Sequence, residues 1–326
     1  MNKIKLIYST TTHPCFTQGF VRGLVDEQFD LVEYDPTKTY SPQDTVVLQT
    51  HVGVLHPEPW HTHLVEQGFK TVVDHLWDSD VDTPSMVKNN ALILRNVNWL
   101  WYRESMHYRF MGYDQYQPQR NYQHAFFMPM NKAREHKDLV LERLATVLDQ
   151  GLYSYADRGR MLPNDFDREQ QGYWLYYFNP EWYDSTCFSV VVESYMRSNM
   201  WQQNPVVPNY KTEISEKSFK PVAYHHPFIT FGSVDTLKYL QREGFETFGN
   251  LWDESYDTIM DDAQRHQAVA HTVIDAVKEY RQGNLKFDKE TEQKLQHNHA
   301  RFFNKALVEQ RFRSEIIADV LSYINS

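Results

Sequence analysis

The sequence has little cysteine and no long apolar run. Its two cysteines, Cys15 and Cys187, lie far apart, so we expect neither a disulfide framework nor a Cys-x-x-Cys site. No stretch approaches the roughly 20 apolar residues that a membrane-spanning helix needs. The N-terminal residues show no apolar segment with a small-residue cleavage site, so no signal peptide is expected. We therefore expect a soluble cytoplasmic protein with no membrane partner.

The chain also lacks an excess of basic residues and the common nucleotide and nucleophile motifs. Its 326 residues carry a net charge of −10, which disfavours a general nucleic-acid coat but is compatible with a local basic groove. A glycine-rich phosphate loop and a nucleophile elbow are absent. Aromatic residues are abundant, with 21 Tyr, 19 Phe and 8 Trp, enough to fill large cores and to line clefts.

The length suits two domains of roughly 100–200 residues each. In the first half, short apolar runs alternate with helical segments, which is typical of a parallel sheet covered on both faces. The aromatic segment 102–123 is the expected interdomain linker. The predicted strands are 3–9, 29–35, 45–51, 70–76 and 90–96, with helices at 16–25 and from Pro57.

Strand–helix alternation resumes at His124, so we predict two doubly wound, Rossmann-like α/β domains with a helical C-terminal tail. The domains are placed at 1–122, including the linker, and at 123–300; a helix at 301–326 can pack back on the first domain. The predicted strands of the second half are 124–130, 188–194 and 227–232, and the predicted helices are 131–151, ended by Gly151, one from Ser215, 234–242, and most of 257–326.

Two charged loops of the second half follow the rule that ligands bind beyond the carboxyl ends of parallel strands. One contains Lys132 and Arg134, and the other begins a helix with Ser215, Glu216 and Lys217. The N-terminus of a helix is a favourable place for a phosphate group. Lysine and arginine side chains add charge-assisted hydrogen bonds to it, and a glutamate can accept hydrogen bonds from the hydroxyls of a ribose. Two interpretations are open: a nucleoside-diphosphate site, or an ordinary capped helix start with an acid in its first turn.

Other polar residues give weaker indications. Glu193 ends a buried strand, and because burying an unpaired carboxylate costs several kcal/mol, it faces either a cleft or open solvent. The histidines of 51–63 cross a proline-rich turn and match no compact zinc signature. The acids of 77–82 are a weak cation pattern, and 253–257, "DESYD", is more typical of a helix cap. No metal site is predicted.

The second half resembles a widespread group of phage-encoded proteins and the donor-binding half of GT-B glycosyltransferases, particularly the α1,3-fucosyltransferase pattern. That pattern has a strand ending in Glu-Asn-Ser and a helix starting Thr-Glu-Lys. Here the matching residues are Glu193-Ser194 and Ser215-Glu216-Lys217. Ser194 in place of Asn and Ser215 in place of Thr depart from the pattern. The resemblance covers about residues 124–260.

The resemblance implies a glycosyltransferase that moves a sugar from a nucleoside-diphosphate sugar to an acceptor hydroxyl. It implies that Glu216 binds the ribose, that Lys217 binds the diphosphate, and that Arg134, early in the first helix of the domain, also meets phosphate. Lys132, Glu193 and Ser215 complete the expected donor site. No essential cofactor is expected, because the helix dipole and basic side chains stabilise the departing diphosphate.

In such an enzyme the first domain binds the acceptor and supplies a base for an inverting transfer. Asp74 and His75, at the end of predicted strand 70–76, are the candidate catalytic residues, with Asp78 behind them; Asp74 can equally cap the next helix. The candidate acceptor-binding residues are His13, His51 and Arg103.

The acceptor has several candidates. The phage resemblance implies a hydroxymethylated base of phage DNA, in the cytoplasm of the host, which requires an extruded base and a basic groove. The arginine- and aromatic-containing stretch 95–122 can serve that groove or simply pack between domains. Saccharide or protein acceptors fit the acidic charge. A catalytically inactive nucleotide-binding or assembly protein on the same scaffold is the alternative from another class. The oligomeric state stays open.

Overall fold

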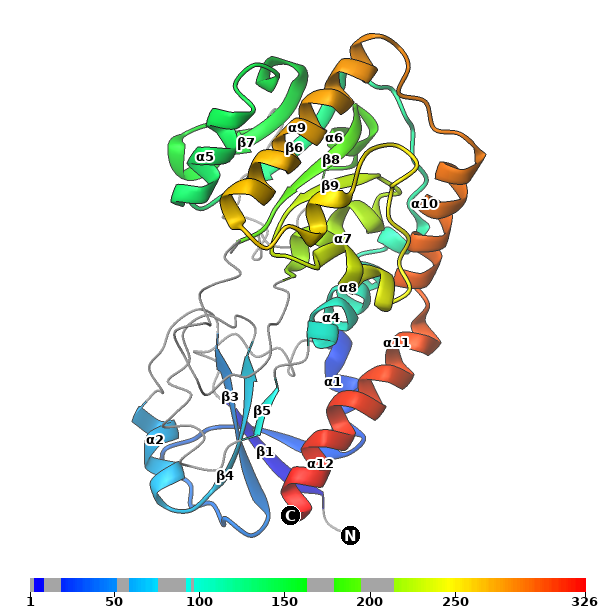
Figure 1. Ribbon diagram of the computed structural model, residues 1–326. Helices are drawn as coiled ribbons and strands as arrows, with labels where there is room; N and C mark the ends of the chain where they lie inside the picture. Colours follow the sequence, from blue (N-terminus) through cyan, green and yellow to red (C-terminus); the bar gives the residue numbers. More distant parts are fainter. Residues whose placement is uncertain are drawn as a thin grey trace. The chain divides into compact units, whose positions relative to one another are not determined.

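The computed structural model describes residues 3–8, 19–51, 59–75, 92–94, 97–162, 179–194 and 214–326. These residues form two compact units (Figure 1). The first unit contains the described residues up to Phe110 together with Lys305–Ser326, and the second contains the described residues between Met111 and Asn304. Each unit is an α/β structure with a parallel sheet, which confirms the predicted fold class.

The first unit has a five-stranded sheet in the order β2-β1-β3-β4-β5, and every pairing is parallel. Apolar side chains such as Ile7 and Val47 are fully buried, as expected of strands covered on both faces. All five strands lie within the runs predicted for this half. Their bounds are β1 Ile4–Tyr8, β2 Phe29–Glu33, β3 Thr45–His51, β4 Lys70–His75 and β5 Leu92–Leu94.

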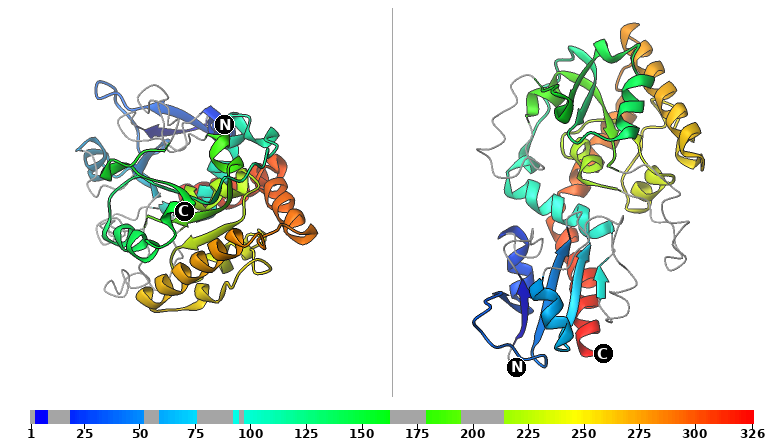
Figure 2. Two further views of the ribbon diagram at one scale, coloured as in Figure 1. Left: turned by 90° about the horizontal axis from the view of Figure 1, so that it is seen from above. Right: turned by 90° about the vertical axis from the view of Figure 1, so that its left-hand side faces the viewer.

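The C-terminal segment packs against the sheet of this first unit. Lys70 Nζ, at the start of β4, donates to the carbonyls of Tyr323 at 3.1 Å and Ile324 at 2.8 Å. Figure 2 shows this segment, coloured red, beside the strands of the unit. The helices of the unit are α1 Gly19–Asp26, α2 Pro59–Glu66, α4 Val97–Phe110, α11 Lys305–Arg311, the π-helix η6 Phe312–Ile317 and α12 Ala318–Asn325.

The second unit has a four-stranded parallel sheet in the order β7-β6-β8-β9. The strand order reverses between β6 and β8, because β7 lies on one side of β6 and the later strands lie on the other. Every residue of β8 is buried. The bounds are β6 His124–Met130, β7 Gly151–Tyr155, β8 Thr186–Val192 and β9 Phe228–Phe231.

Helices cover both faces of this sheet. The ring of Phe127 packs on α6, whereas the ring of Phe231 packs on His266 of α9. The register pairs Phe127 with Ser189 and Phe231 with Val192, and residues an odd number apart in a strand point to opposite faces. The helices are α5 Glu135–Arg143, α6 Pro180–Asp184, α7 Glu216–Ala223, α8 Thr236–Arg242, α9 Asp262–Arg281 and α10 Lys289–Phe302.

The helix predicted to continue to Gly151 is wrong in its second half. α5 ends at Arg143, and Gly151 begins strand β7. Gly151 is opposite Phe126 in the register, and a Cβ there would lie 2.2 Å from the Phe126 ring. β7 is a short edge strand that is only partly buried, so its sequence carries no continuous apolar run. The buried stripe of this segment consists of Lys137, Val140, Leu144 and Val147.

The helical tail is confirmed by α9 and α10, which follow the short 3-10 helix η5, Ser255–Thr258. Side chains cap both helices: Asp261 accepts from the Gln264 amide at 2.8 Å, and Asp288 accepts from the Thr291 amide at 2.8 Å. Such caps satisfy amides that have no partner inside the helix. Within the described residues, no helix combines the length and the apolar character needed to cross a membrane.

Candidate phosphate site of the second unit

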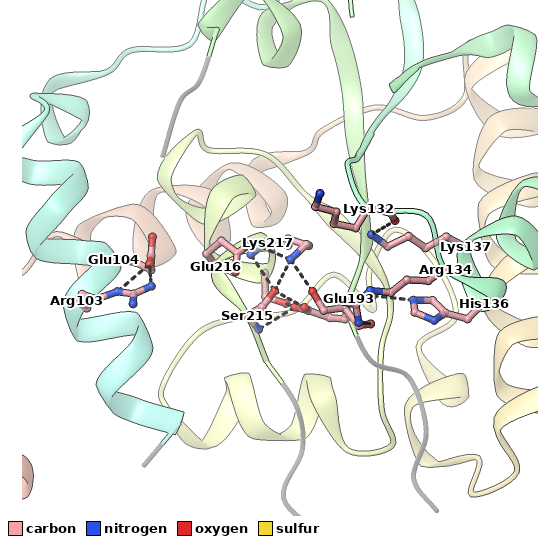
Figure 3. Close-up of polar contacts among 12 residues, drawn as sticks. Arg103, Glu104, Lys132, Arg134, His136, Lys137, Glu193, Ser215, Glu216 and Lys217 are labelled. Atoms are coloured by element: carbon pink, nitrogen blue, oxygen red, sulfur yellow. Dashed lines mark hydrogen bonds and ion pairs between the residues drawn. The ribbon is translucent and has the colours of Figure 1, made fainter. Parts of the chain in front are cut away.

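The charged residues of the second unit gather where its strand order reverses. The chain leaves β6 toward α5, and it leaves the adjacent strand β8 at Glu193 and Ser194. At such a reversal, neighbouring connections run to opposite faces of the sheet and leave a crevice beyond the strand ends. Figure 3 shows side chains from α5, from the end of β8 and from the start of α7 pointing toward one another.

Glu193 fastens the start of α7 to the end of β8. Its side chain is buried, with 2% of the residue exposed. Oε1 accepts from the Ser215 amide at 3.1 Å and from Ser218 Oγ at 2.7 Å, and Oε2 accepts from Ser215 Oγ. These three donors compensate the carboxylate for its lost hydration. Neither sequence expectation for Glu193 named this arrangement, in which the carboxylate faces a helix N-terminus.

The first turn of α7 is a capped helix start that also positions the charged side chain of Lys217. Ser215 is the N-cap, and its Oγ accepts from the Lys217 amide at 3.3 Å. The Lys217 ammonium group donates to Ser194 Oγ at 3.0 Å, to Ser215 Oγ at 3.2 Å and to Glu216 Oε1 at 2.7 Å. The two interpretations of this turn are therefore compatible, since the cap itself positions Lys217 beside Ser194.

Glu216 forms an ion pair with Lys217 in this turn, and only 6% of its side chain is exposed. Burial acts to raise the pKa of the Glu216 carboxyl, but Lys217 and Lys220 outweigh it and lower the pKa to about 2. Glu216 is thus ionised at neutral pH and accepts hydrogen bonds only.

The side chains of α5 meet the same place from the other side. Arg134, the residue that precedes α5, donates from Nη1 to the Ser194 carbonyl at 2.7 Å. His136 Nε2 lies 3.2 Å from the Glu193 carbonyl. Arg134 and Lys217 therefore both contact Ser194, although their helices follow different strands. The structure brings together five of the six predicted donor-site residues: Arg134, Glu193, Ser215, Glu216 and Lys217.

Lys132, the sixth, lies apart from this group. Its ammonium group is 3.8 Å from Asp157 Oδ1, and 65% of its side chain is exposed. An exposed pair of this kind contributes little to stability. The backbone of Lys132 does contact a residue of α5, because its carbonyl accepts a hydrogen bond from Lys137 Nζ at 3.1 Å.

Lys137 is the residue that the sequence prediction missed. It is 2% exposed, and its burial, together with repulsion from Lys217 and Arg134, lowers its pKa to about 8, although Glu216 and Glu193 act in the opposite direction. The available signal was its spacing: Lys137 follows Arg134 by three residues, which places both side chains on one side of the helix. We call Arg134, Lys137 and Lys217 the cation cluster.

The predicted catalytic residues lie in the first unit. Asp74 and His75 are the last two residues of β4, and the register pairs His75 with His51, the last residue of β3. The backbone thus places these three positions at the carboxyl edge of the sheet, where they were expected. Asp78 and His13 lie outside the described residues.

Arg103, predicted to bind the acceptor, is a buried residue of α4 with 5% exposure. Its guanidinium donates to Glu104 Oε1, from Nη2 at 2.5 Å and from Nε at 3.2 Å. Glu104 is fully buried as well. In the described contacts Arg103 therefore serves an internal ion pair of the first unit.

The "DESYD" segment caps helices, as its sequence indicated. Asp257 accepts from the amides of Leu237 at 2.8 Å and Lys238 at 3.1 Å, in the first turn of α8. Asp253 accepts from the Ser255 amide at 2.9 Å at the start of η5. The described residues contain no group of three or more histidine, cysteine or acidic side chains placed to hold a metal ion.

Comparison with known proteins leaves the family of this chain open. No protein-family model and no curated protein matches the sequence. Among solved structures, an α1,3-fucosyltransferase with GDP-fucose matches over 94% of this chain and 90% of its own, with 9% identity and a TM-score of 0.40.

Proposed function

We propose that the protein is a glycosyltransferase that uses a nucleoside-diphosphate sugar and binds its diphosphate between Arg134 and Lys217. The observation that carries the proposal is the meeting of Arg134 and Lys217 at Ser194, at 2.7 Å and 3.0 Å. Guanidinium and ammonium groups are the usual partners of phosphate oxygens, and the amides that begin α7 add a partial positive charge. A strand-order reversal is also where doubly wound sheets bind nucleotides.

In this proposal Glu216 changes partner when the donor binds. Without ligand, Lys217 is held by Glu216 Oε1 at 2.7 Å. A diphosphate offers Lys217 a more highly charged partner, so the ammonium group turns toward it. The ionised Glu216 carboxylate is then available to accept hydrogen bonds from the ribose hydroxyls of the donor.

The chemical step breaks the bond between the anomeric carbon and the diphosphate oxygen, and the acceptor oxygen bonds to that carbon. The electron pair of the broken bond goes to the diphosphate, whose added charge Arg134 and Lys217 stabilise. The proton of the acceptor hydroxyl goes to a base. We assign the base to Asp74 or His75, at the carboxyl edge of the first sheet.

A thermal-shift screen tests donor binding. Ligands that bind only the native state raise Tm by mass action. At a free ligand concentration of 100 times Kd, the free energy of unfolding rises by about 2.7 kcal/mol. Wild type is heated with UDP, GDP, ADP, CDP and their sugar conjugates, and we expect a shift with one nucleotide class. Lys217→Ala and Arg134→Ala should lose that shift, whereas Lys289→Ala, at an exposed position at the start of α10, should keep it.

The binding proposal fails if none of these nucleotides shifts wild type, or if the Lys217→Ala and Arg134→Ala variants shift as wild type does. Transfer is tested separately, with hydroxymethylated DNA, oligosaccharides and a protein as acceptors. Binding without transfer or hydrolysis of any nucleotide sugar would identify the inactive nucleotide-binding protein instead.

A further inference from the structure

Lys137 is a buried cation whose surroundings leave it short of negative charge. Its ammonium group has three N–H donors, and the described contacts provide one acceptor, the Lys132 carbonyl at 3.1 Å. Among the described residues, no carboxylate lies within ion-pair distance of Lys137 Nζ. A buried ammonium is normally paired, because the loss of hydration is expensive.

The charged side chains that act on Lys137 come from the start of α5, from α7 and from the end of β8. Arg134, just before α5, and Lys217, in α7, repel the Lys137 ammonium group. Glu216, in α7, and Glu193, at the end of β8, attract it. Glu193 is already occupied by the donors of Ser215 and Ser218, and Glu216 by Lys217. The two nearby carboxylates are therefore committed to α7.

The side chain of Lys137 is directed at the phosphate site. In Figure 3, Lys137 and Arg134 extend from α5 toward Glu193, and Lys217 approaches from α7. A diphosphate held between Arg134 and Lys217 would bring the missing negative charge to the buried ammonium group. A single phosphate carries less negative charge and has fewer oxygens to share among the three side chains Arg134, Lys137 and Lys217.

We infer that Lys137 is the third phosphate-binding cation of this site, that the site selects a diphosphate over a monophosphate, and that ligand binding is linked to protonation of Lys137. The inference rests on the proposed function. Above pH 8 the free protein carries Lys137 largely uncharged, and the bound diphosphate restores its proton from solvent. Below pH 7 the proton is already present, so binding takes up none at this residue.

Titration calorimetry tests the linkage, with the nucleoside diphosphate that gives the largest shift in the screen as probe and its monophosphate as comparison. Heats measured in buffers of different ionisation enthalpy give the protons taken up. We expect wild type to take up about 0.7 proton more at pH 8.5 than Lys137→Met does, and about the same number at pH 6.5. Subtracting the proton uptake of Lys137→Met from that of wild type removes the contribution of protons that the ligand itself gains or loses.

Affinity provides the second readout. At pH 7, Lys137→Met should bind the diphosphate about 10- to 100-fold more weakly and lose most of the preference over the monophosphate. Wild-type affinity should fall toward tenfold per pH unit above pH about 8, and that of Lys137→Met should not. Lys289→Met should match wild type throughout. Thermal unfolding of each variant verifies that it is folded.

The possible failures are separable. If Lys217→Ala loses diphosphate binding but Lys137→Met binds as wild type does, with the same pH profile, the inference is overturned and the proposed function stands. Equal proton uptake by wild type and Lys137→Met assigns the linkage to another group and also overturns it. If wild type binds no nucleoside diphosphate, the proposed function fails, and the inference fails with it.

Discussion

Replacing Lys137 with methionine should stabilise the ligand-free protein, which is the opposite of the usual effect of changing a buried residue. Methionine has a similar length without a charge, so it retains the packing of the stem on the buried stripe of α5. The pKa of Lys137 falls from 10.5 to about 8. At about 1.4 kcal/mol per pKa unit, holding the charge in the native state costs about 3 kcal/mol at pH 7.

The sign of the pH dependence follows from linkage. The pKa of Lys137 is lower in the folded protein than in the unfolded chain, so between pH about 8 and pH about 10.5 the unfolded chain binds more protons. Wild-type stability therefore rises with pH in this window, whereas Lys137→Met has no group to titrate there. The advantage of the variant should be largest at pH 7 and should shrink by about 2 kcal/mol by pH 9.5.

Differential scanning calorimetry of wild type and variant at pH 7 and pH 9.5 measures both effects. A gain of about 3 kcal/mol corresponds to a rise of about 6–12 °C in Tm for a unit of this size. Lys289→Met, at an exposed lysine of the same unit, should change Tm little at either pH. A Lys137→Met variant that melts at or below wild type at pH 7 refutes the reasoning, as does an advantage that is unchanged at pH 9.5.

Three further changes in the second unit, with one control change in the first, test the packing and the charges described above. Gly151→Ala places a Cβ 2.2 Å from the Phe126 ring and should lower the free energy of unfolding, measured by calorimetry, by about 1–3 kcal/mol. Gly23→Ala, in α1 with nothing within 4 Å, should raise it by up to about 1 kcal/mol. Equal effects of the two changes would contradict the packing of Gly151 on Phe126. Glu193→Gln should lower stability by about 1.5–3 kcal/mol, measured by denaturant unfolding, because it weakens three hydrogen bonds to a charged acceptor. Glu216→Gln should flatten the acid dependence of Tm between pH about 4.5 and 2, since the lowered pKa of Glu216 adds stability that is present above this window and is lost as pH falls through it; an unchanged profile would exclude Glu216 as its source.

Sequence prediction succeeded where the signal is local. The strands β1 to β4 and β6, β8 and β9 lie within the short, largely apolar runs of the sequence, and such runs are typical of strands in a parallel sheet. The helix start at Ser215 is also local, because the capping side chain acts on an amide two positions ahead. β7 failed because an edge strand packs through its partner: Gly151 is explained by the ring of Phe126, which lies 25 residues earlier.

The amino-acid sequence by itself determined the parallel α/β class, and it placed Arg134 and Lys217 at helix starts beyond strand ends. Only the tertiary structure decided what these residues do for one another. Strand order is a long-range property, and it makes the ends of β6 and β8 neighbours, so that both cations meet at Ser194. The same packing turns Glu193 into the anchor of α7 and buries Lys137 without a carboxylate within ion-pair distance among the described residues. Burial and pairing depend on groups brought together from distant parts of the chain, and no local pattern encodes them.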